Sequence, residues 1–321
     1  MNHNAFTLKS LTAAINAVPF QPTRIAQLGL FQEAGIATLD AAVEEKNGVL
    51  SLLDVKPRGG PGNTTGEETR KVRTLRCPHI PASDTVRADE VQGVRAFGSD
   101  STAEVLATRR DEKLMVMRNS IDYTIEAHRV KAIKGVYVDN NGTDTSLFTL
   151  FGVTQQTKAI GLSAVASSGI RADMMDVKKK IRTALGGIPW MGVRVLCGDA
   201  FWAALLEDMD TKATYLNQAQ AAELRGDPTN SFQAFGATWE WYEGTTDATF
   251  GDDAYAIPMG VPGMFITRFA PADYEETVNT QGLPYYAKAE RMKFGKGYEL
   301  EAQSNPLNIC TLPKGVIKLT I

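Results

Sequence analysis

Hydrophobic residues recur every three or four positions in the middle of the chain and predict one long helix. Ser101 and Glu104 have the spacing of a capping box, which satisfies the free N–H groups at a helix start. No proline or glycine follows until Gly135, a residue type that suits the position just after a helix end. We therefore predict a helix over residues 101–134, about 50 Å long at roughly 1.5 Å per residue.

This helix combines an apolar stripe with a basic opposite face. The stripe consists of Leu114, Met117, Ile121, Ile125, His128 and Ala132. The basic residues of the opposite face are Arg109, Arg110, Lys113, Arg118 and Arg129. Such a pattern predicts a helix that packs on one side and exposes most of its circumference. We interpret His128, on or beside the stripe, as a partly buried structural histidine and not as a ligand.

Two Asn-Gly pairs predict β-hairpins, one before and one after the helix, because the favoured hairpin turns need two residues with positive φ. Asn47-Gly48 would join a strand over 36–46 to a second one over 49–56. Asn141-Gly142 would join Val136–Val138 to Leu147–Leu150. Near the N-terminus, an amphipathic helix is predicted by the spacing of Phe6, Leu8, Leu11, Ile15 and Val18.

The second half of the chain predicts a compact unit in which strands and helices alternate. Residues 171–185 have an apolar helical face and end at Gly186-Gly187. The apolar segment VRVLCG then leads to Asp199, which we expect to cap the helix AFWAALLED. Aromatic-rich segments around 235–257 predict further strands.

The C-terminal segments predict strands that return to a sheet. LNICTL and VIKLTI are apolar and short, as strands are. In GYELEAQSN, apolar residues alternate with polar ones, so the polar residues Glu299, Glu301 and Gln303 should point outward.

Residues 54–76 differ from the rest because a Gly/Pro/Asn/Thr-rich tip lies between arms with few large apolar residues. Six basic residues against three acidic ones give the segment a net charge of +3. The basic residues are Lys56, Arg58, Arg70, Lys71, Arg73 and Arg76. An arm of this composition cannot bury enough apolar surface to be held by its own domain. Composition slightly favours a loose loop; the alternative is an arm across a neighbouring subunit, paired with its carboxylates.

Composition and motifs favour a structural protein. The 321 residues are 43% hydrophobic with a formal net charge of −3, which indicates a globular chain that does not bind phosphates through bulk charge. Three widely spaced cysteines support neither a disulfide framework nor a zinc site. The sequence shows no catalytic, cofactor or metal motif, no signal peptide and no apolar run of about 20 residues. We expect no enzyme, no cofactor, no membrane contact and synthesis in a cytoplasm.

The order of these parts resembles the tailed-phage major capsid proteins of the HK97-like fold, and most of all the lambda-type family called phage major capsid protein E. Four segments carry the resemblance: FTLKSLTAAINAVPFQPTRIAQLGLF, RRDEKLMVMRNSIDYTIEAHRVKAIKGVY, VLCGDAFWAALLED and GYELEAQSNPLNICTLPKGVIKL. They spread over essentially the whole chain as a diffuse pattern. None of their residues is catalytic in that family.

The resemblance implies an α+β capsid fold and a division of the chain. Residues 1–35 would form an N-terminal arm and 36–100 an extended loop region with β-hairpins. Residues 101–169, with a spine helix over 101–134 and a hairpin, would form a peripheral domain, completed by part of 262–321. Residues 170–261 would form the axial domain.

The function implied is that of a major capsid subunit that self-assembles into an icosahedral phage head around double-stranded DNA. The expected partner is the protein itself, in hexamers and pentamers; scaffolding, portal and decoration proteins and non-specifically contacted DNA are further ones. The protein would be assembled in the host cytoplasm and reside in the virion capsid. Two alternatives stay open: an encapsulin-like cargo shell of the same fold, and a soluble enzyme or binding protein without a recognisable motif.

Overall fold

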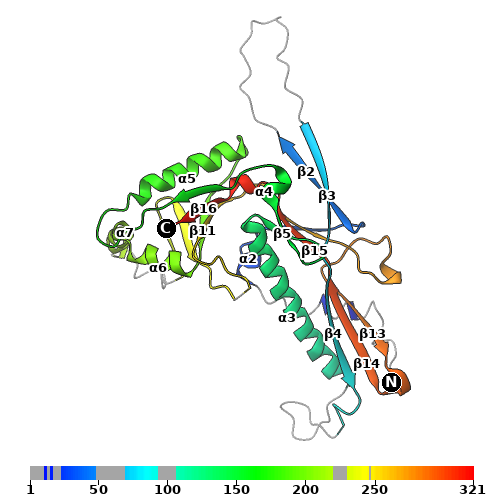
Figure 1. The fold of residues 1–321 in the computed structure, drawn as a ribbon. Coiled ribbons are helices and arrows are strands. Elements are labelled where there is room, and N and C mark those ends of the chain that lie inside the picture. Colours follow the sequence, from blue (N-terminus) through cyan, green and yellow to red (C-terminus); the bar gives the residue numbers. More distant parts are fainter. Residues whose placement is uncertain are drawn as a thin grey trace, which may run out of the picture.

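The structure, a computed structural model, combines helices with several small sheets in an elongated molecule (Figure 1). It describes residues 11–12, 15–16, 23–47, 69–92, 106–219, 230–245 and 247–321. Helices and strands mix along the chain, as the predicted α+β class requires. Among the helices of these ranges, none is both long and apolar enough to cross a membrane.

A 28-residue helix, α3 (Leu106–Ile133), confirms the predicted long helix from Leu106 onward; residues 101–105 lie outside the described ranges. The helix ends where the sequence predicts, because Gly135 has a φ of +85° and its N–H donates to the Ala132 carbonyl at 3.1 Å. A Cβ on Gly135 would lie 2.2 Å from the Phe148 ring. The turn therefore needs glycine both for its backbone conformation and for space.

The prediction that α3 exposes most of its circumference is wrong. The apolar stripe is buried as expected, but four charged side chains on α3 are buried as well. These are Arg118, Asp122, Glu126 and Arg129, each at most 5% exposed. Arg118 and Arg129 belong to the face that the pattern left to solvent. Segments distant in sequence, among them residues 15–33, supply the polar partners that allow this face to be buried.

The largest sheet has six strands in the order β7-β16-β11-β8-β10-β9. They are β7 (Gln156–Ala159), β8 (Gly192–Cys197), β9 (Ser231–Ala234), β10 (Ala237–Trp241), β11 (Ala254–Met259) and β16 (Ile317–Thr320). The helices of this region are α5 (Ile170–Leu185), α6 (Asp199–Glu207) and α7 (Met209–Ala219). The buried side chains of α5 and α6 share one apolar core with the sheet. Both β7 and β16 lie outside 170–261, so the sheet draws on more of the chain than the axial segment defined by sequence.

The helices of this unit begin and end close to their predicted positions. Gly186 and Gly187 follow α5 with positive φ. Asp199, however, is the first residue of α6 and not its cap. The preceding Gly198 occupies the capping position, while the Asp199 carboxylate accepts a hydrogen bond from the Trp241 indole at 2.8 Å.

A three-stranded antiparallel sheet lies along the N-terminal half of α3 (Figure 1). Its strands, in order, are β13 (Tyr286–Arg291), β14 (Gly297–Ser304) and β4 (Ile80–Arg87). Leu300 and Ala302 face a core shared with α3 and with the described N-terminal residues Leu11 and Ile15. Gln303, predicted to point into solvent, is fully buried, because Asp273 provides its amide with a hydrogen-bond acceptor at 2.6 Å.

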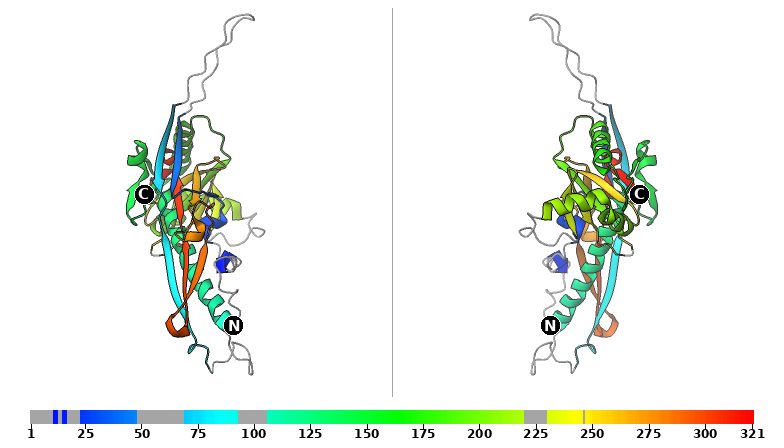
Figure 2. Two further views of the ribbon diagram at one scale, coloured as in Figure 1. Left: turned by 90° about the vertical axis from the view of Figure 1, so that its right-hand side faces the viewer. Right: turned by 90° about the vertical axis from the view of Figure 1, so that its left-hand side faces the viewer.

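An antiparallel hairpin of β2 (Asp40–Asn47) and β3 (Thr69–Arg76) extends away from the body in the direction opposite to β13 and β14 (Figures 1 and 2). The sequence pairs 36–46 with 49–56, but β2 pairs with β3. The ladder continues through Asn47, which lies opposite Thr69, so the strand does not turn at this residue. Gly48 and residues 49–56 lie outside the described ranges.

A central apolar core joins these parts. It includes residues of a third sheet, in which β12 lies between β1 and β15. The strands of this third sheet are β1 (Gln32–Gly35), β12 (Phe265–Phe269) and β15 (Pro306–Cys310). The remaining short helices are α2 (Arg24–Gln27), η3 (Glu275–Thr277), η4 (Lys293–Gly295) and η5 (Pro313–Gly315). Fully or nearly fully buried side chains of this core come from both ends of the chain, so the fold is closed by contacts distant in sequence.

The second predicted hairpin is confirmed in its turn and first strand. β5 (Val136–Val138) pairs with β6 (Asp144–Ser146) around Gly142, whose φ is +76°. The predicted second strand is wrong, because Leu147–Phe151 form the short helix α4. Ser146 begins this helix by accepting a hydrogen bond from the Thr149 N–H, which removes these residues from the ladder.

Candidate functional site: surfaces for contact between copies

Four of the six basic residues that the sequence assigns to contacts between copies lie on β3. Lys56 and Arg58 lie outside the described residues. Arg70 and Lys71 lie on β3, in register with Lys46 and Glu45 of β2. In this register Arg70 is opposite a basic residue, whereas Lys71 is opposite an acidic residue of its own chain.

The base of this hairpin packs on the chain's own core. Val43 and Leu75 are at most 6% exposed, in the same core as Phe151 of α4. The Arg73 guanidinium lies 5.8 Å from the centre of the Phe151 ring, which is a cation–π distance. Arg76 is exposed. The sequence groups Arg73 with the contacts to other copies, whereas the structure gives it a partner within its own chain.

The face of the β13–β14–β4 sheet that points away from α3 carries a cluster of carboxylates. Glu290 and Glu299 lie directly opposite each other on β13 and β14, and both are exposed. Like charges in this position destabilise an isolated sheet. The next pair on the same face is Lys288 with Glu301, whose carboxylate accepts a hydrogen bond from Tyr274 at 3.1 Å.

This face forms a groove of about 760 Å³. The residues that line it are Ser83, Asp84, Thr85, Tyr274, Lys288, Ala289, Glu290, Glu299, Leu300 and Glu301. Glu290, Glu299 and Glu301 with Lys288 give this face a formal charge of −2; the Asp84 carboxylate lies toward α3, 3.6 Å from the Lys113 ammonium. The sequence marked Glu299 and Glu301 as outward but gave no role to Glu290; the alternation in Tyr286–Arg291 is the signal that could have found it.

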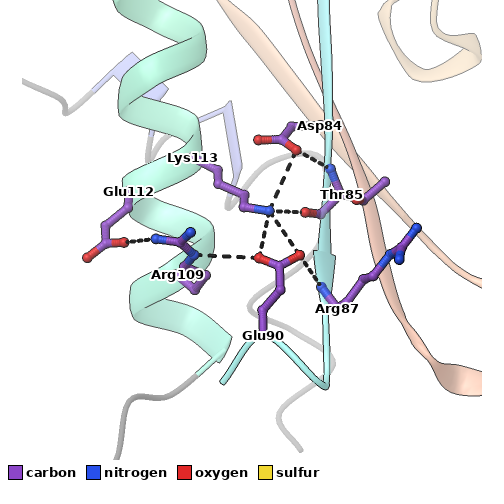
Figure 3. A network of polar contacts seen from close by, with 7 residues as sticks. All are labelled: Asp84, Thr85, Arg87, Glu90, Arg109, Glu112 and Lys113. Carbon is purple, nitrogen blue, oxygen red and sulfur yellow. Dashed lines mark hydrogen bonds and ion pairs between the residues drawn. The ribbon is translucent and has the colours of Figure 1, made fainter. Parts of the chain in front are cut away.

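Polar contacts fix the start of α3 to β4 (Figure 3). The Lys113 ammonium donates to the Thr85 carbonyl and lies 2.8 Å from a Glu90 carboxylate oxygen. Arg109 bridges Glu90, at 3.5 Å, and Glu112, at 2.8 Å. The hydrogen bond from Lys113 holds the pKa of Glu90 below its usual range. Because these charges are paired within the chain, this cluster positions α3 and leaves little charge for a partner.

A second polar network, deeply buried, holds the N-terminal segment against α3. The Glu126 carboxylate accepts hydrogen bonds from the Thr23 hydroxyl at 2.6 Å and the Ile25 N–H at 2.8 Å. It also accepts one from the Tyr242 hydroxyl at 3.1 Å. Burial raises the pKa of Tyr242, and the nearby Glu126 carboxylate raises this pKa further. One side chain therefore joins the N-terminal segment, α3 and the end of β10.

The same network continues one turn earlier on α3. Arg118 donates to the Ile15 carbonyl at 2.5 Å, and its guanidinium lies 4.4 Å from the centre of the Tyr285 ring. The Tyr285 hydroxyl donates to Asp122. Burial raises the pKa of Asp122, against the opposite effects of Tyr285 and Arg118. The charges of this network are matched inside the chain, so it is a structural feature of the subunit.

The described side chains offer non-covalent contacts and little reactive chemistry. Cys77, Cys197 and Cys310 are free and buried. Burial raises the pKa of the Cys77 and Cys310 thiols to about 12 in each case, which keeps them protonated and unreactive. Within the described ranges, no group of three or more His, Cys, Asp or Glu side chains could hold a metal ion.

Comparison with known proteins identifies relatives along the whole chain. The family model described as "Phage major capsid protein E" matches residues 7–321. The major capsid protein of Salmonella phage Felix O1 (isolate Felix O1-VT1) is 25% identical, with 96% of this chain and 94% of the relative covered. The major capsid protein of Pseudomonas phage KPP10 is 23% identical, with 98% and 97% covered.

A solved structure shows the same fold. The putative capsid protein of a prophage of E. coli CFT073 superposes with a TM-score of 0.61 at 13% identity. The match covers 98% of this chain and 99% of the prophage protein. An identity this low carries information about fold alone, and the fold is the HK97-like one of phage capsids.

Proposed function

Because the chain belongs to the phage major capsid protein E family and is a structural subunit of a capsid shell, we propose that its copies form an icosahedral phage head as hexamers and pentamers. Double-stranded DNA fills the head and is contacted non-specifically. Scaffolding, portal and decoration proteins are further partners, and assembly takes place in the host cytoplasm. The family is structural and not enzymatic.

Within the subunit, we assign the roles that the resemblance suggests. α3 and the β13–β14–β4 sheet form the peripheral domain, with α3 as its spine. The six-stranded sheet with α5, α6 and α7 forms the axial domain, at the fivefold and sixfold axes. The β2–β3 hairpin is the extended loop that crosses a neighbouring copy.

The observation that carries the proposal is the β2–β3 hairpin, which leaves the body as a two-stranded arm anchored only at its base (Figure 2). A two-stranded arm is marginal in water by itself. Its second strand, β3, has four basic residues and no acidic one, which favours a neighbour that offers carboxylates, since charge complementarity sets partner and register. Each contact can be weak, because a closed shell holds every copy through several neighbours at once.

The test is charge reversal on the arm. Arg70→Glu combined with Arg76→Glu should reduce the yield of shells in electron micrographs at least about tenfold, because each reversal acts at every copy of the shell. Arg73 is left unchanged, since it packs on Phe151. The matched control is Lys314→Glu, an exposed residue of η5. Unchanged particle counts with a normally folded double variant would overturn the role of the arm.

A cargo shell of the same fold is separated from a phage head by its contents. Particles recovered from the native source should contain double-stranded DNA, which nuclease protection and absorbance measure directly. Particles filled with protein and free of DNA would contradict the phage-head proposal.

A further inference from the structure

An exposed aromatic residue in an unfavourable backbone conformation marks the tip of the β13–β14 hairpin. Phe294 is 95% exposed and has a φ of +62°. Gly295 follows with a φ of +66°. A turn with two successive residues of positive φ favours Asn-Gly, while a bulky side chain at the first position is sterically disfavoured. Phenylalanine at this position therefore weakens the isolated turn.

Backbone hydrogen bonds nevertheless hold the tip in this conformation. The Met292 N–H donates to the Gly297 carbonyl at 3.0 Å, and the Gly295 N–H donates to the Met292 carbonyl at 3.1 Å. The two strands pair up to Arg291 and Tyr298, immediately before the turn. The strain is thus held in place by the hairpin, and the Phe294 ring stays in solvent. A strained side chain that is 95% exposed among the described residues points to a contact outside the subunit.

The charge of the tip indicates what kind of surface it can bind. Arg291, Lys293 and Lys296 surround Phe294, all exposed. Within the described residues, none of the three basic side chains has an ion pair with a carboxylate. The tip therefore offers one ring and a formal charge of +3 to a partner with an acidic, concave surface.

We propose that the tip of one copy docks into the groove on the β13–β14–β4 sheet of a second copy, an inference that rests on the proposed shell function. The groove face, with its formal charge of −2, is opposite in sign to the tip. The opposed pair Glu290–Glu299 would gain a counter-charge that it does not have among the described residues. Tyr274, whose ring already lies 5.1 Å from the Lys288 ammonium, lines the groove and offers Phe294 an aromatic partner.

The proposed contact joins the Phe294 tip to the groove, and we expect it to form between copies because the tip cannot reach the groove of its own copy. The turn between Met292 and Gly297 prevents Phe294 from folding back onto the face of its own sheet. β13 and β14 carry the tip and part of the groove lining, and both strands extend away from β2 and β3 (Figures 1 and 2). A contact of this heterologous kind continues from copy to copy and closes into a ring when the rotation permits.

The first test separates stability from assembly with the variant Phe294→Asn. Asparagine suits the positive φ, so the urea midpoint of the unassembled chain should stay equal or rise. The critical concentration for shell formation should rise about tenfold or more, because a desolvated aromatic anchor is lost at each contact. Val165→Asn, at a residue 90% exposed before α5, is the matched control and should change neither. Unaltered assembly of Phe294→Asn would overturn the proposal.

The second test identifies the occupant of the groove by disulfide cross-linking. Phe294→Cys and Ser83→Cys in one chain should give a ladder of linked chains on a non-reducing gel, while each single variant stays monomeric. The native cysteines are buried, so background cross-linking is low. Cross-linking by Phe294→Cys alone would mean that tips meet one another and would overturn the groove as partner. A link from Ser83→Cys to Arg70→Cys, without one to Phe294→Cys, would assign the groove to the β2–β3 hairpin instead.

The two proposals fail in different ways. A wild-type chain that forms no shells under any condition contradicts the proposed function. In that case, disulfide cross-linking of the same cysteine pair tests the tip contact in the small oligomers that form at high protein concentration. No linked chains in shells or in such oligomers would overturn the tip contact, whatever the fate of the shell proposal.

Discussion

The two halves of α3 use charged residues in opposite ways. In the C-terminal half and just before it, Arg118, Asp122, Glu126 and Arg129 are buried and joined to residues from distant parts of the chain. In the N-terminal half, ionic residues gather around Glu90 at the surface, within reach of water (Figure 3). Helix periodicity alone does not tell buried charges that join distant segments from surface charges that form ion pairs. The burial of each side chain in the fold does.

The difference explains how the subunit divides stability from assembly. A buried carboxylate that accepts several hydrogen bonds cannot lose its partners without a large penalty, so Thr23 and Ile25 are held firmly in the folded subunit. Surface ion pairs contribute little and are screened by salt. Changes in the buried network should therefore alter folding, whereas changes on the β2–β3 hairpin and at the Phe294 tip should alter assembly.

The largest effect is expected for Glu126. Glu126→Ala leaves the Thr23 hydroxyl, the Ile25 N–H and the Tyr242 hydroxyl without their acceptor. The free energy of unfolding of the unassembled chain should fall by about 3–5 kcal/mol, as measured by urea titration. Glu112→Ala, a half-exposed carboxylate near the start of α3, should lower it by less than about 1 kcal/mol. Similar losses in the two variants would remove the contrast between the halves.

The next effect concerns His128, on the C-terminal half. Burial, followed by the nearby Lys131, lowers its pKa to about 4, while Asp144 acts in the opposite direction. The unfolded chain has a histidine pKa of about 6.5, so protonation favours the unfolded state. Stability is complete above about pH 6.5 and is lost as the pH falls toward 4, by up to about 3 kcal/mol.

The control for this pH dependence is His128→Gln, which cannot take up a proton. Urea midpoints of both proteins, measured at pH 7 and pH 4.5, should show a smaller loss in the variant. Equal losses in the two proteins would mean that the His128 ring does not contribute to acid sensitivity.

The smallest effect is expected at the start of α3. Lys113→Met keeps the aliphatic part of the side chain and removes the ammonium that contacts Thr85 and Glu90. The expected loss is about 1 kcal/mol and should shrink in 1 M salt, because screening weakens the ion pairs already in the wild type. A loss as large as that of Glu126→Ala, independent of salt, would show that this end is as tightly integrated as the other.

The sequence predicted elements well where a local signal decides them. Gly135 and Gly186 end α3 and α5 because both positions need positive φ, and the helical stripes are read directly from spacing. The Asn47-Gly48 turn was predicted from an equally strong local signal, yet β2 continues through Asn47, because pairing with β3 outweighs the turn preference. Leu147 was assigned to a strand and lies in a helix capped by Ser146, a competition that alternation alone cannot resolve.

The candidate surfaces were predictable only in part, because contacts distant in sequence decide burial. Arg118 and Arg129 belong to a basic helix face in the sequence, and only the fold brings Ile15 and Glu33 to them. Arg73 shares the charge pattern of its neighbours on β3 and packs on Phe151 all the same. Exposure of Phe294 is equally invisible in sequence, since its φ and its surroundings depend on the β13–β14 register.

Cryo-electron microscopy of the purified chain tests the central claim most directly. Copies of this subunit should form closed hollow particles in which the β2–β3 hairpin of each copy crosses an adjacent one. Small oligomers at every protein concentration, with the hairpin resting on its own subunit, would contradict the account.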